Sequence, residues 1–259
     1  MNTDTDLLSP ARHTVVSRDA WLAQRRSLLE REKALTQAQD AMAEARRTMP
    51  WVRVEQPYVF DTADGPRSLS DLFEGRRQLL VQHFMLGPGW AQGCPSCSFM
   101  ADHLDGMAVH LAQRDVSLLR VSRAPLAEIQ RFQARMGWQV RWVSSHGNRF
   151  NFDYGVSFEP GATAAGEVDY NYALRPFPSD EAPGISVFCR DDAGDVFHTY
   201  STYGRGVEVM MGTYPLLDLT PRGRDEAGLP YTMAWVRHHD RYEPAPATKT
   251  SAACCATHG

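Results

Sequence analysis

Two cysteines with the spacing of a redox or metal site, Cys94 and Cys97, occur in the run GCPSC. Thiols one helical turn apart can close a disulfide without any other rearrangement, which is the basis of dithiol chemistry. The apolar run 79–85 predicts a buried strand before the pair, and 98–113 predicts a helix after it. A thiol at a helix N-terminus faces unpaired backbone N–H groups, so its pKa falls from ~8.5 to between ~3.5 and ~7.5. The pattern therefore predicts a reactive cysteine at a strand-to-helix turn.

The composition excludes several functional classes. The chain has 259 residues, 43% of them hydrophobic, and a formal net charge of -4, which gives no basic face for nucleic acid. No apolar run approaches the ~18 residues that span a membrane, and the acidic, polar N-terminus does not resemble a secretory signal. Five cysteines are too few for a disulfide scaffold of this length. We therefore expect a cytoplasmic protein with neither nucleic-acid nor membrane partners.

The N-terminal part, 1–50, predicts a helical arm. Ser17 can cap a helix over 18–47, and Pro50 ends it. Its large apolar residues recur every seven positions, but the positions between them are polar, which is half of a coiled-coil pattern. We expect the arm to lie along its own domain, because narrow apolar stripes usually dock on a core. The alternative is an arm that makes a homodimer.

The remainder predicts one α/β domain over 51–243 and a disordered tail over 244–259. Strands are expected at 116–121 and 140–144, with a helix at 125–136 between them and a further helix near 207–211. The turn Asp191–Asp195 between two apolar runs predicts a hairpin. We interpret 146–182 as an insertion with short strands and expect 219–242 to pack outside the core. Alternation of strands and helices favours a mixed sheet covered on both faces.

The order strand, CxxC, helix, strand, helix, strand, hairpin, helix resembles the thioredoxin fold, a three-layer sandwich. Thioredoxin-like proteins place a cis-proline before the hairpin, opposite the thiols, where its backbone helps to bind substrate. Pro183 stands at that position. The segments 116–145 and 153–156 look like the peroxiredoxin branch of the superfamily. That branch needs a threonine and a proline at fixed spacing before its cysteine, whereas Pro88 is one residue too close to Cys94 and no threonine intervenes.

From about 13 to 242 the chain resembles a bacterial family known as domain of unknown function 899, described as predicted thioredoxin-like dithiol-disulfide oxidoreductases. The matching runs are 15–18, 93–99, 121–125, 197–203 and 217–221. The resemblance implies that Cys94 is the nucleophile and Cys97 the resolving thiol, acting on a protein or small-molecule disulfide or thiol without a cofactor. It also implies that Trp90, Pro95 and Pro183 bind substrate.

Other interpretations of the pair remain open. Thioredoxins bury a carboxylate behind the resolving thiol, but this strand offers Gln82 and His83, so His83 is the candidate base. Copper(I) could instead bind Cys94 and Cys97 as soft thiolate ligands, completed by His83 or Met100. Zinc is disfavoured because the chain has no second CxxC. A third alternative is a non-catalytic thioredoxin-like binding module.

Three further cysteines lie away from the pair. Cys189, in the first apolar run of the expected hairpin, is interpreted as a core residue that behaves as a small hydrophobe. Cys254 and Cys255 belong to the tail, where His258 lies nearby. They could deliver metal or electrons to the main pair, but termini of this composition tolerate almost any sequence, which favours a dispensable end.

Overall fold

The computed structural model describes residues 13–243, and Cys254, Cys255 and the predicted tail lie outside them. The predicted N-terminal helix is confirmed as α1 (Arg18–Arg47). The Ser17 side chain accepts a hydrogen bond from the Ala20 N–H at 3.3 Å, which satisfies one of the free donors of the first turn. Helix α1 ends at Thr48, before Pro50.

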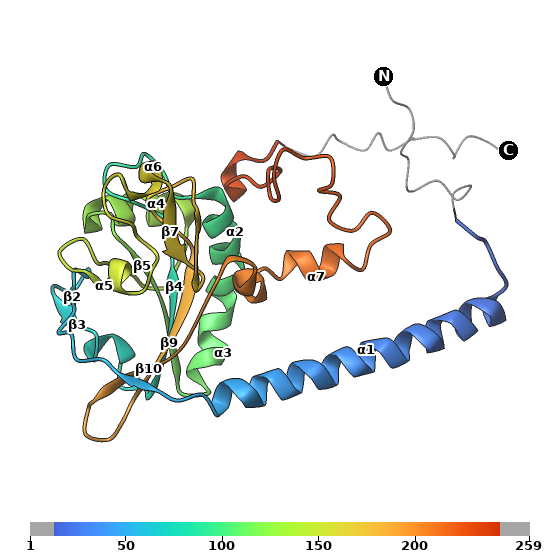
Figure 1. The fold of residues 1–259 in the computed structure, drawn as a ribbon, viewed down its shortest axis with the longest axis horizontal. Helices are drawn as coiled ribbons and strands as arrows, with labels where there is room; N and C mark the ends of the chain where they lie inside the picture. The colour runs from blue at the N-terminus through green and yellow to red at the C-terminus, as the bar shows by residue number, and fades with distance from the viewer. Residues whose placement is uncertain (1–12, 244–259) are drawn as a thin grey trace, which may run out of the picture.

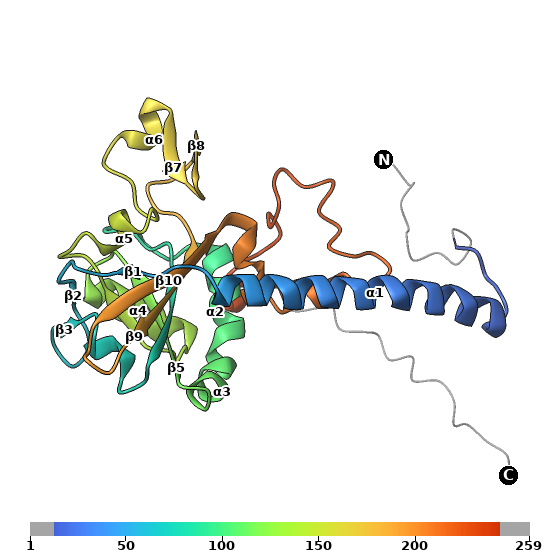
Figure 2. The same cartoon turned by 60° about the horizontal axis from the view of Figure 1, so that its bottom comes forward.

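Helix α1 projects away from the domain, as Figures 1 and 2 show from two directions. None of its residues is buried, and the apolar side chains of Trp21 and Leu35 are 47% and 61% exposed. The expectation that this arm lies along its own domain is therefore wrong. The reason lies in the strand that follows: β1 (Val52–Arg53) pairs with the edge of the sheet, so the chain meets the domain only at the last turn of the helix.

A six-stranded mixed sheet forms the centre of the domain, in the order β1-β10-β9-β4-β5-β6. The parallel half of the sheet consists of β4 (Gln78–His83), β5 (Val116–Ser122) and β6 (Trp142–Ser144). The hairpin of β9 (Gly184–Arg190) and β10 (Val196–Tyr203) runs antiparallel beside β4. This order of strands, CxxC, helices and hairpin is the thioredoxin-like arrangement predicted from the sequence.

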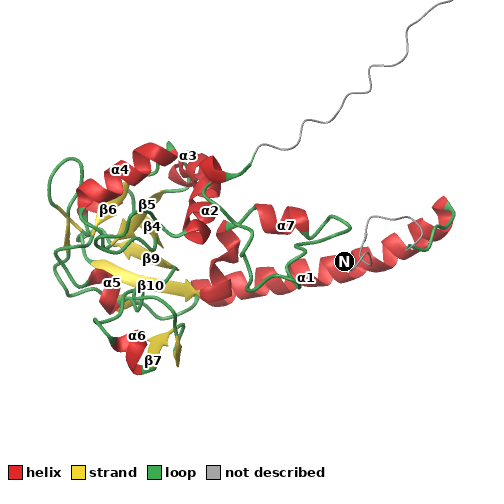
Figure 3. Ribbon diagram, turned by 90° about the horizontal axis from the view of Figure 1, so that it is seen from above, coloured by secondary structure: helices red, strands yellow, loops and turns green. Residues whose placement is uncertain are grey.

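Helices cover both faces of the sheet (Figure 3). One face carries α2 (Pro95–Leu104), α3 (Ala108–Ala112) and α4 (Leu126–Met136). Core residues of α2 and α4, among them Phe99, Ile129 and Phe132, pack there in one cluster with Phe84 and Trp142. The other face carries the 3-10 helix η2 (Asp71–Phe73), α5 (Phe150–Asp153) and the hairpin of β2 (Val59–Phe60) and β3 (Arg67–Ser68). The predicted three layers are thus present.

The single helix predicted over 98–113 is divided. A 3-10 turn, η3 (Asp105–Met107), separates α2 from α3. Its Asp105 carboxylate accepts hydrogen bonds from the Gln139 and Val140 N–H groups and from Arg120, all outside the helix. These contacts fix the direction of the chain at the end of α2.

The predicted insertion contains α6 (Ala162–Ala165) and a separate hairpin of β7 (Glu167–Tyr170) and β8 (Ala173–Pro176). After β10 come η4 (Gly204–Met210), α7 (Thr213–Leu217) and η5 (His239–Arg241). The expectation that 219–242 packs wholly outside the core is wrong, because Val236 and His238 are each only 3% exposed. The ring of neighbouring Trp235 lies against Phe99 of α2, at 5.7 Å between centroids, and this contact draws the segment inward. No helix in the described range is long and apolar enough to cross a membrane.

Candidate functional site

The two thiols lie where β4 and its loop meet the start of α2, so the predicted strand-to-helix placement is confirmed. Cys94 is the N-cap residue of α2 and Pro95 the first helical residue, a position at which proline fits because its missing N–H has no helical partner. The Cys94 N–H donates to the Met85 carbonyl at 3.0 Å, and the Met85 N–H approaches the Cys97 sulfur at 3.5 Å. The loop after β4 is thereby joined to the first turn of the helix.

The two cysteines differ in exposure and in acidity. Both are free thiols; Cys94 is half-buried, whereas Cys97 is fully buried. Interaction with the Cys97 side chain lowers the pKa of Cys94 to about 7, assisted by the N–H groups of Cys97 and Ser96 and opposed by burial. Burial, reinforced by the neighbouring Cys94, raises the pKa of Cys97 well above its usual range. Cys94 therefore becomes the thiolate first, and Cys97 holds its proton.

Gly93 allows the loop to pass between two aromatic rings. A Cβ atom at this position would lie 2.5 Å from the Phe84 ring and 2.8 Å from the Phe132 ring. Any side chain would therefore push the Phe84 and Phe132 rings apart or move the loop that carries Cys94.

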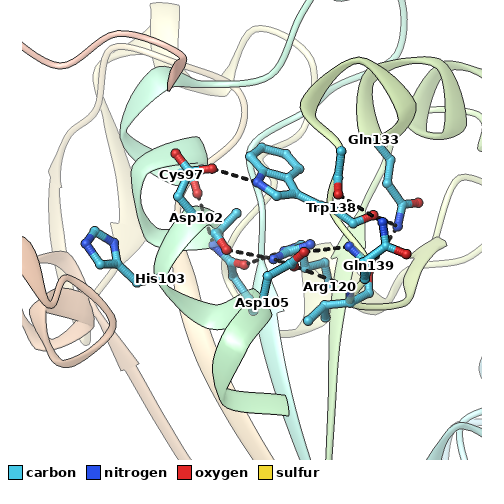
Figure 4. A network of polar contacts seen from close by, with 12 residues as sticks. Cys97, Asp102, His103, Asp105, Arg120, Gln133, Trp138 and Gln139 are labelled. Carbon is cyan, nitrogen blue, oxygen red and sulfur yellow. Dashed lines mark hydrogen bonds and ion pairs between the residues drawn. The ribbon is translucent and has the colours of Figure 1, made fainter. Parts of the chain in front are cut away.

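A buried polar network joins α2 to the neighbouring strands of the sheet (Figure 4). The Gln82 amide donates to the Cys97 carbonyl at 3.2 Å, and the Arg120 Nε donates to the Gln82 side-chain oxygen at 3.1 Å. The fully buried Arg120 also donates to the Ala101 carbonyl and forms an ion pair with Asp105 at 2.7 Å. The β4 residue that contacts α2 is thus Gln82, an amide hydrogen-bonded to Arg120, at the place where thioredoxins have a carboxylate.

His83, the candidate base and metal ligand, is not brought to the thiols. Successive residues of a strand point to opposite faces, so Gln82 faces α2 and His83 faces α5. The His83 ring packs against Phe150 and Tyr154, and its Nε2 bonds the Ser186 hydroxyl at 2.7 Å. Burial lowers the pKa of His83 to about 3. A neutral imidazole on the far face of the sheet is not positioned to move a proton at either sulfur.

Ser186 extends this contact into a hydrogen-bonded chain, which we call the histidine relay and define as His83, Ser186, Ser201 and His198. The Ser186 and Ser201 hydroxyls lie 2.7 Å apart, and Ser201 lies 2.7 Å from the His198 Nε2. His198 lines a cavity of about 800 Å³ together with Tyr58, Asp153 and Tyr154. The relay therefore links the buried His83 to a polar cavity on the face away from the cysteines.

Pro183 directly precedes β9, as expected, but its peptide bond is trans, because the described residues contain no cis peptide. The chain enters β9 already extended, with the Ala182 N–H bonded to the Val156 carbonyl at 2.8 Å. Tyr170 of the insertion donates its hydroxyl to the Pro183 carbonyl at 2.8 Å and accepts the Gly204 N–H at 2.9 Å. Burial raises the pKa of Tyr170 to about 12, so this phenol keeps its proton and can donate to the Pro183 carbonyl.

The other proposed substrate-binding residues flank the pair. Pro95 is exposed beside Cys94, and Trp90 lines a cavity of about 350 Å³ with Arg131 and Arg135 of α4. Their contact with substrate stays a prediction. Cys189 is half-buried and lines a different cavity of about 530 Å³ with Arg46 and Tyr200, and burial raises its pKa.

A metal centre with three or more ligands is not assembled in the described residues, where no three His, Cys, Asp or Glu side chains converge. The two sulfurs alone could hold copper(I), and Met100, 1% exposed on α2, joins the same core cluster. Since His83 lies across the sheet, the ligand set that includes it is not brought together.

One residue that contacts the Cys94 loop comes from a segment the sequence placed outside the core. The His238 Nε2 lies 2.9 Å from the Gly93 carbonyl, and its Nδ1 lies 3.2 Å from the Arg135 guanidinium. The only sequence signal was the apolar Trp235 and Val236 just before it. Neither residue type nor spacing linked His238 to the cysteines.

Comparison with solved structures finds only distant similarity among those named below. Solved structures with distant similarity include the bacterioferritin comigratory protein of Xanthomonas campestris, at 9% identity and a TM-score of 0.41 over 60% of this chain and 88% of that one. Peroxidoxin BcpB from Mycobacterium tuberculosis shares 17% identity, with a TM-score of 0.34 over 62% and 96% of the two chains. A putative thiol:disulfide interchange protein DsbE from Chlorobium tepidum shares 11%, with a TM-score of 0.38 over 64% and 98%.

No curated protein sequence matches this chain. The family model described as bacterial protein of unknown function (DUF899) matches residues 10–242, which include the whole sheet, both thiols and the segment that carries His238. The chain therefore belongs to the DUF899 family.

Proposed function

We propose that this protein is a thiol-disulfide oxidoreductase in which Cys94 is the nucleophile and Cys97 the resolving thiol. The observation that carries the proposal is the unequal state of the two thiols. Cys94 is half-buried at a helix N-terminus with its pKa lowered to about 7, while Cys97 is fully buried with its pKa raised. An exchange cycle needs one thiol that attacks readily and one that waits for the mixed disulfide.

The cycle consists of two exchanges. The Cys94 thiolate attacks one sulfur of a substrate disulfide, a Cys94–substrate disulfide forms, and the other substrate sulfur leaves as a thiolate that takes up a proton. Cys97 then attacks the Cys94 sulfur as a thiolate, which closes the Cys94–Cys97 disulfide. The second substrate sulfur leaves and takes up the proton that Cys97 gave up. The substrate gains two electrons and the protein loses two. Two thiols of another protein or small molecule, oxidised together to a disulfide, return the two electrons and restore the dithiol.

Cysteine substitutions test the proposal. Reduced Cys94→Ser should lose turnover with insulin or a small aromatic disulfide, whereas the matched variant Cys189→Ser should retain it. Cys97→Ser should accumulate a mixed disulfide with the substrate, visible by mass spectrometry, because the resolving step is removed. Turnover that survives in Cys94→Ser would disprove the assignment.

Copper(I) carriage is the alternative use of the same two sulfurs. It predicts stoichiometric copper in protein purified anaerobically, and loss of that copper in Cys97→Ser. A non-catalytic binding module predicts a Cys94 thiol with the ordinary pKa of ~8.5 and no exchange in any variant. Elemental analysis and a thiol count on the same fresh sample separate these cases from the redox pair. We propose a cytoplasmic location, where such a pair would be kept reduced between cycles.

We further propose that α1 pairs with α1 of a second copy in the antiparallel direction. The stripe of Trp21, Leu28 and Leu35 is 45% to 61% exposed and joins none of the core clusters of the described residues. Parallel pairing in register would set Arg25 against Arg25 and Glu32 against Glu32, which antiparallel pairing avoids. Light scattering should report a dimer for the native chain and a monomer for Leu28→Glu/Leu35→Glu; a monomeric native chain would rule out the pairing.

A further inference from the structure

A short segment near the C-terminus returns to the loop that carries the nucleophile. We call residues 236–240 the strap. It is anchored at one end by Val236, buried in the core beside α2, and at the other by Asp240, which accepts two hydrogen bonds of 2.8 Å from Arg135 of α4. Between these anchors His238 is 3% exposed, with its ring edge-on to Phe132 at 5.3 Å. The strap thus holds one imidazole rigidly against the active-site loop.

The partners of His238 determine where its proton lies. The Arg135 guanidinium can only donate, so the His238 Nδ1 accepts its hydrogen bond. The proton of the neutral ring is therefore on Nε2, which donates to the Gly93 carbonyl at 2.9 Å. Arg135 also donates to the Gln92 side chain at 3.2 Å, so two successive residues of the loop are held from the strap side.

The Gly93 carbonyl belongs to the peptide unit that enters Cys94. The N–H of that same peptide donates to the Met85 carbonyl at 3.0 Å, and the two flanking rings leave no room for a side chain at Gly93. Hydrogen bonds to His238 and to Met85 therefore hold this peptide unit at its carbonyl and at its N–H. Since this unit sets the direction of the Cys94 side chain, it also sets how the sulfur meets the N–H groups of Ser96 and Cys97.

We propose that His238 is a positioning residue for the thiolate of Cys94, acting through the Gly93–Cys94 peptide. Its meaning for catalysis rests on the proposed oxidoreductase function, but its effect on the thiol does not. In this role His238 supplies the Gly93 carbonyl with a hydrogen-bond donor of fixed direction. A side chain that donates from the Nε2 position should replace it, and one that cannot should let the peptide turn.

The test is the pH profile of Cys94 alkylation in the reduced full-length chain, followed with iodoacetamide and peptide mass spectrometry. In His238→Ala the midpoint should move upward from about 7 toward the ~8.5 of a free thiol. His238→Gln, which keeps a donor at the Nε2 position, should restore the native profile. The matched control His239→Ala removes the adjacent, 43% exposed histidine and should leave the profile unchanged.

An unshifted profile in folded His238→Ala, or an equal shift in His238→Gln, would overturn the proposal. Should His238→Ala fail to fold by circular dichroism, His238→Phe decides, because it keeps a ring against Phe132 but cannot donate to the Gly93 carbonyl; an upward shift supports the role and a native profile refutes it. Alkylation uses no disulfide substrate. Absence of exchange turnover in the native protein would therefore defeat the oxidoreductase proposal, but the alkylation profiles would still test the role of His238.

Discussion

Two polar centres lie on opposite sides of β4, and they originate from adjacent residues. Gln82 faces α2 and contacts the Cys97 carbonyl, whereas His83 faces α5 and begins the histidine relay. The thiol centre lies at a helix N-terminus with one half-buried sulfur, so N–H groups can stabilise a charge there. At His83, burial keeps the ring neutral, and the neighbouring His198 adds to that effect.

The difference teaches that burial alone does not make a reactive group. Burial opposes ionisation at both centres, as it does for any charged form. At Cys94 the opposing hydrogen bonds outweigh it and the pKa falls. At His83 nothing outweighs it, and its Nδ1 has no hydrogen-bond partner in the described structure. The thiol centre is therefore suited to chemistry, and the relay to the stability of the fold.

The largest expected effect is an acid sensitivity that comes from the relay face. Unfolded His83 takes up a proton below pH ~6.5, whereas folded His83 does so only near pH 3. Between these values the unfolded state binds more protons, so the free energy of unfolding falls as the pH drops, by up to about 1.4 kcal/mol per pH unit.

Urea denaturation at pH 7, 6, 5 and 4 measures this slope. His83→Gln should flatten it whatever its stability at pH 7, while the exposed His110→Gln should keep the native slope. Equal slopes in the native protein and His83→Gln would show that His83 is not held neutral, and the contrast between the two faces would be lost.

The next effect belongs to the thiol face. Gly93→Ala would place a methyl group 2.5 Å from the Phe84 ring, and overpacking of this kind costs about 1–3 kcal/mol. We expect a lower denaturation midpoint together with an altered Cys94 alkylation profile, because the loop moves. Gly106→Ala, where a Cβ meets nothing within 4 Å, is the matched control and should cost little. Full native stability in Gly93→Ala would contradict the close packing of Gly93 between the Phe84 and Phe132 rings.

A comparable loss, confined to stability, is expected from Ser186→Ala. It removes the 2.7 Å partner of the His83 Nε2, and an unpaired buried polar group costs about 1–3 kcal/mol. The same change in a His83→Leu background should cost less, because the imidazole that Ser186→Ala leaves unpaired is then absent, while Ser201 keeps its contact with His198. Disulfide exchange by Cys94 should not change, since the hydroxyl lies across the sheet. Additive costs would show that Ser186 and His83 do not interact. Slowed exchange would couple the two centres and break the comparison.

The smallest effect is expected at the outer edge of the thiol face. Tyr170→Phe removes one hydroxyl that bonds both the Pro183 carbonyl and the Gly204 N–H, at a cost of about 1 kcal/mol. Thermal denaturation beside Tyr231→Phe, a 69% exposed tyrosine, gives the reference. A loss no larger than that of the control would mean that the insertion does not support the Pro183 turn.

Much of the fold was predictable because its signals are local. The cap at Ser17 and the stop at Pro50 gave the bounds of α1 almost to the residue, and apolar runs gave β4, β5 and α4. The position of α1 was not predictable. An apolar stripe indicates that one face of a helix can be buried, but it does not identify the surface that would bury it. The division of the helix after Cys97 depended on Asp105 reaching residues more than thirty positions away.

The candidate site divides in the same way. Residue types and spacing were enough to predict the thiol pair, its place at a strand-to-helix turn and a lowered pKa of Cys94, because helix N-terminal donors lie within a few residues of the cap. Only the tertiary structure decided that His83 faces away from the sulfurs, that Arg120 supports Gln82, and that His238 holds the Gly93 carbonyl. These depend on strand parity and on contacts between segments up to 145 positions apart, which no local pattern encodes.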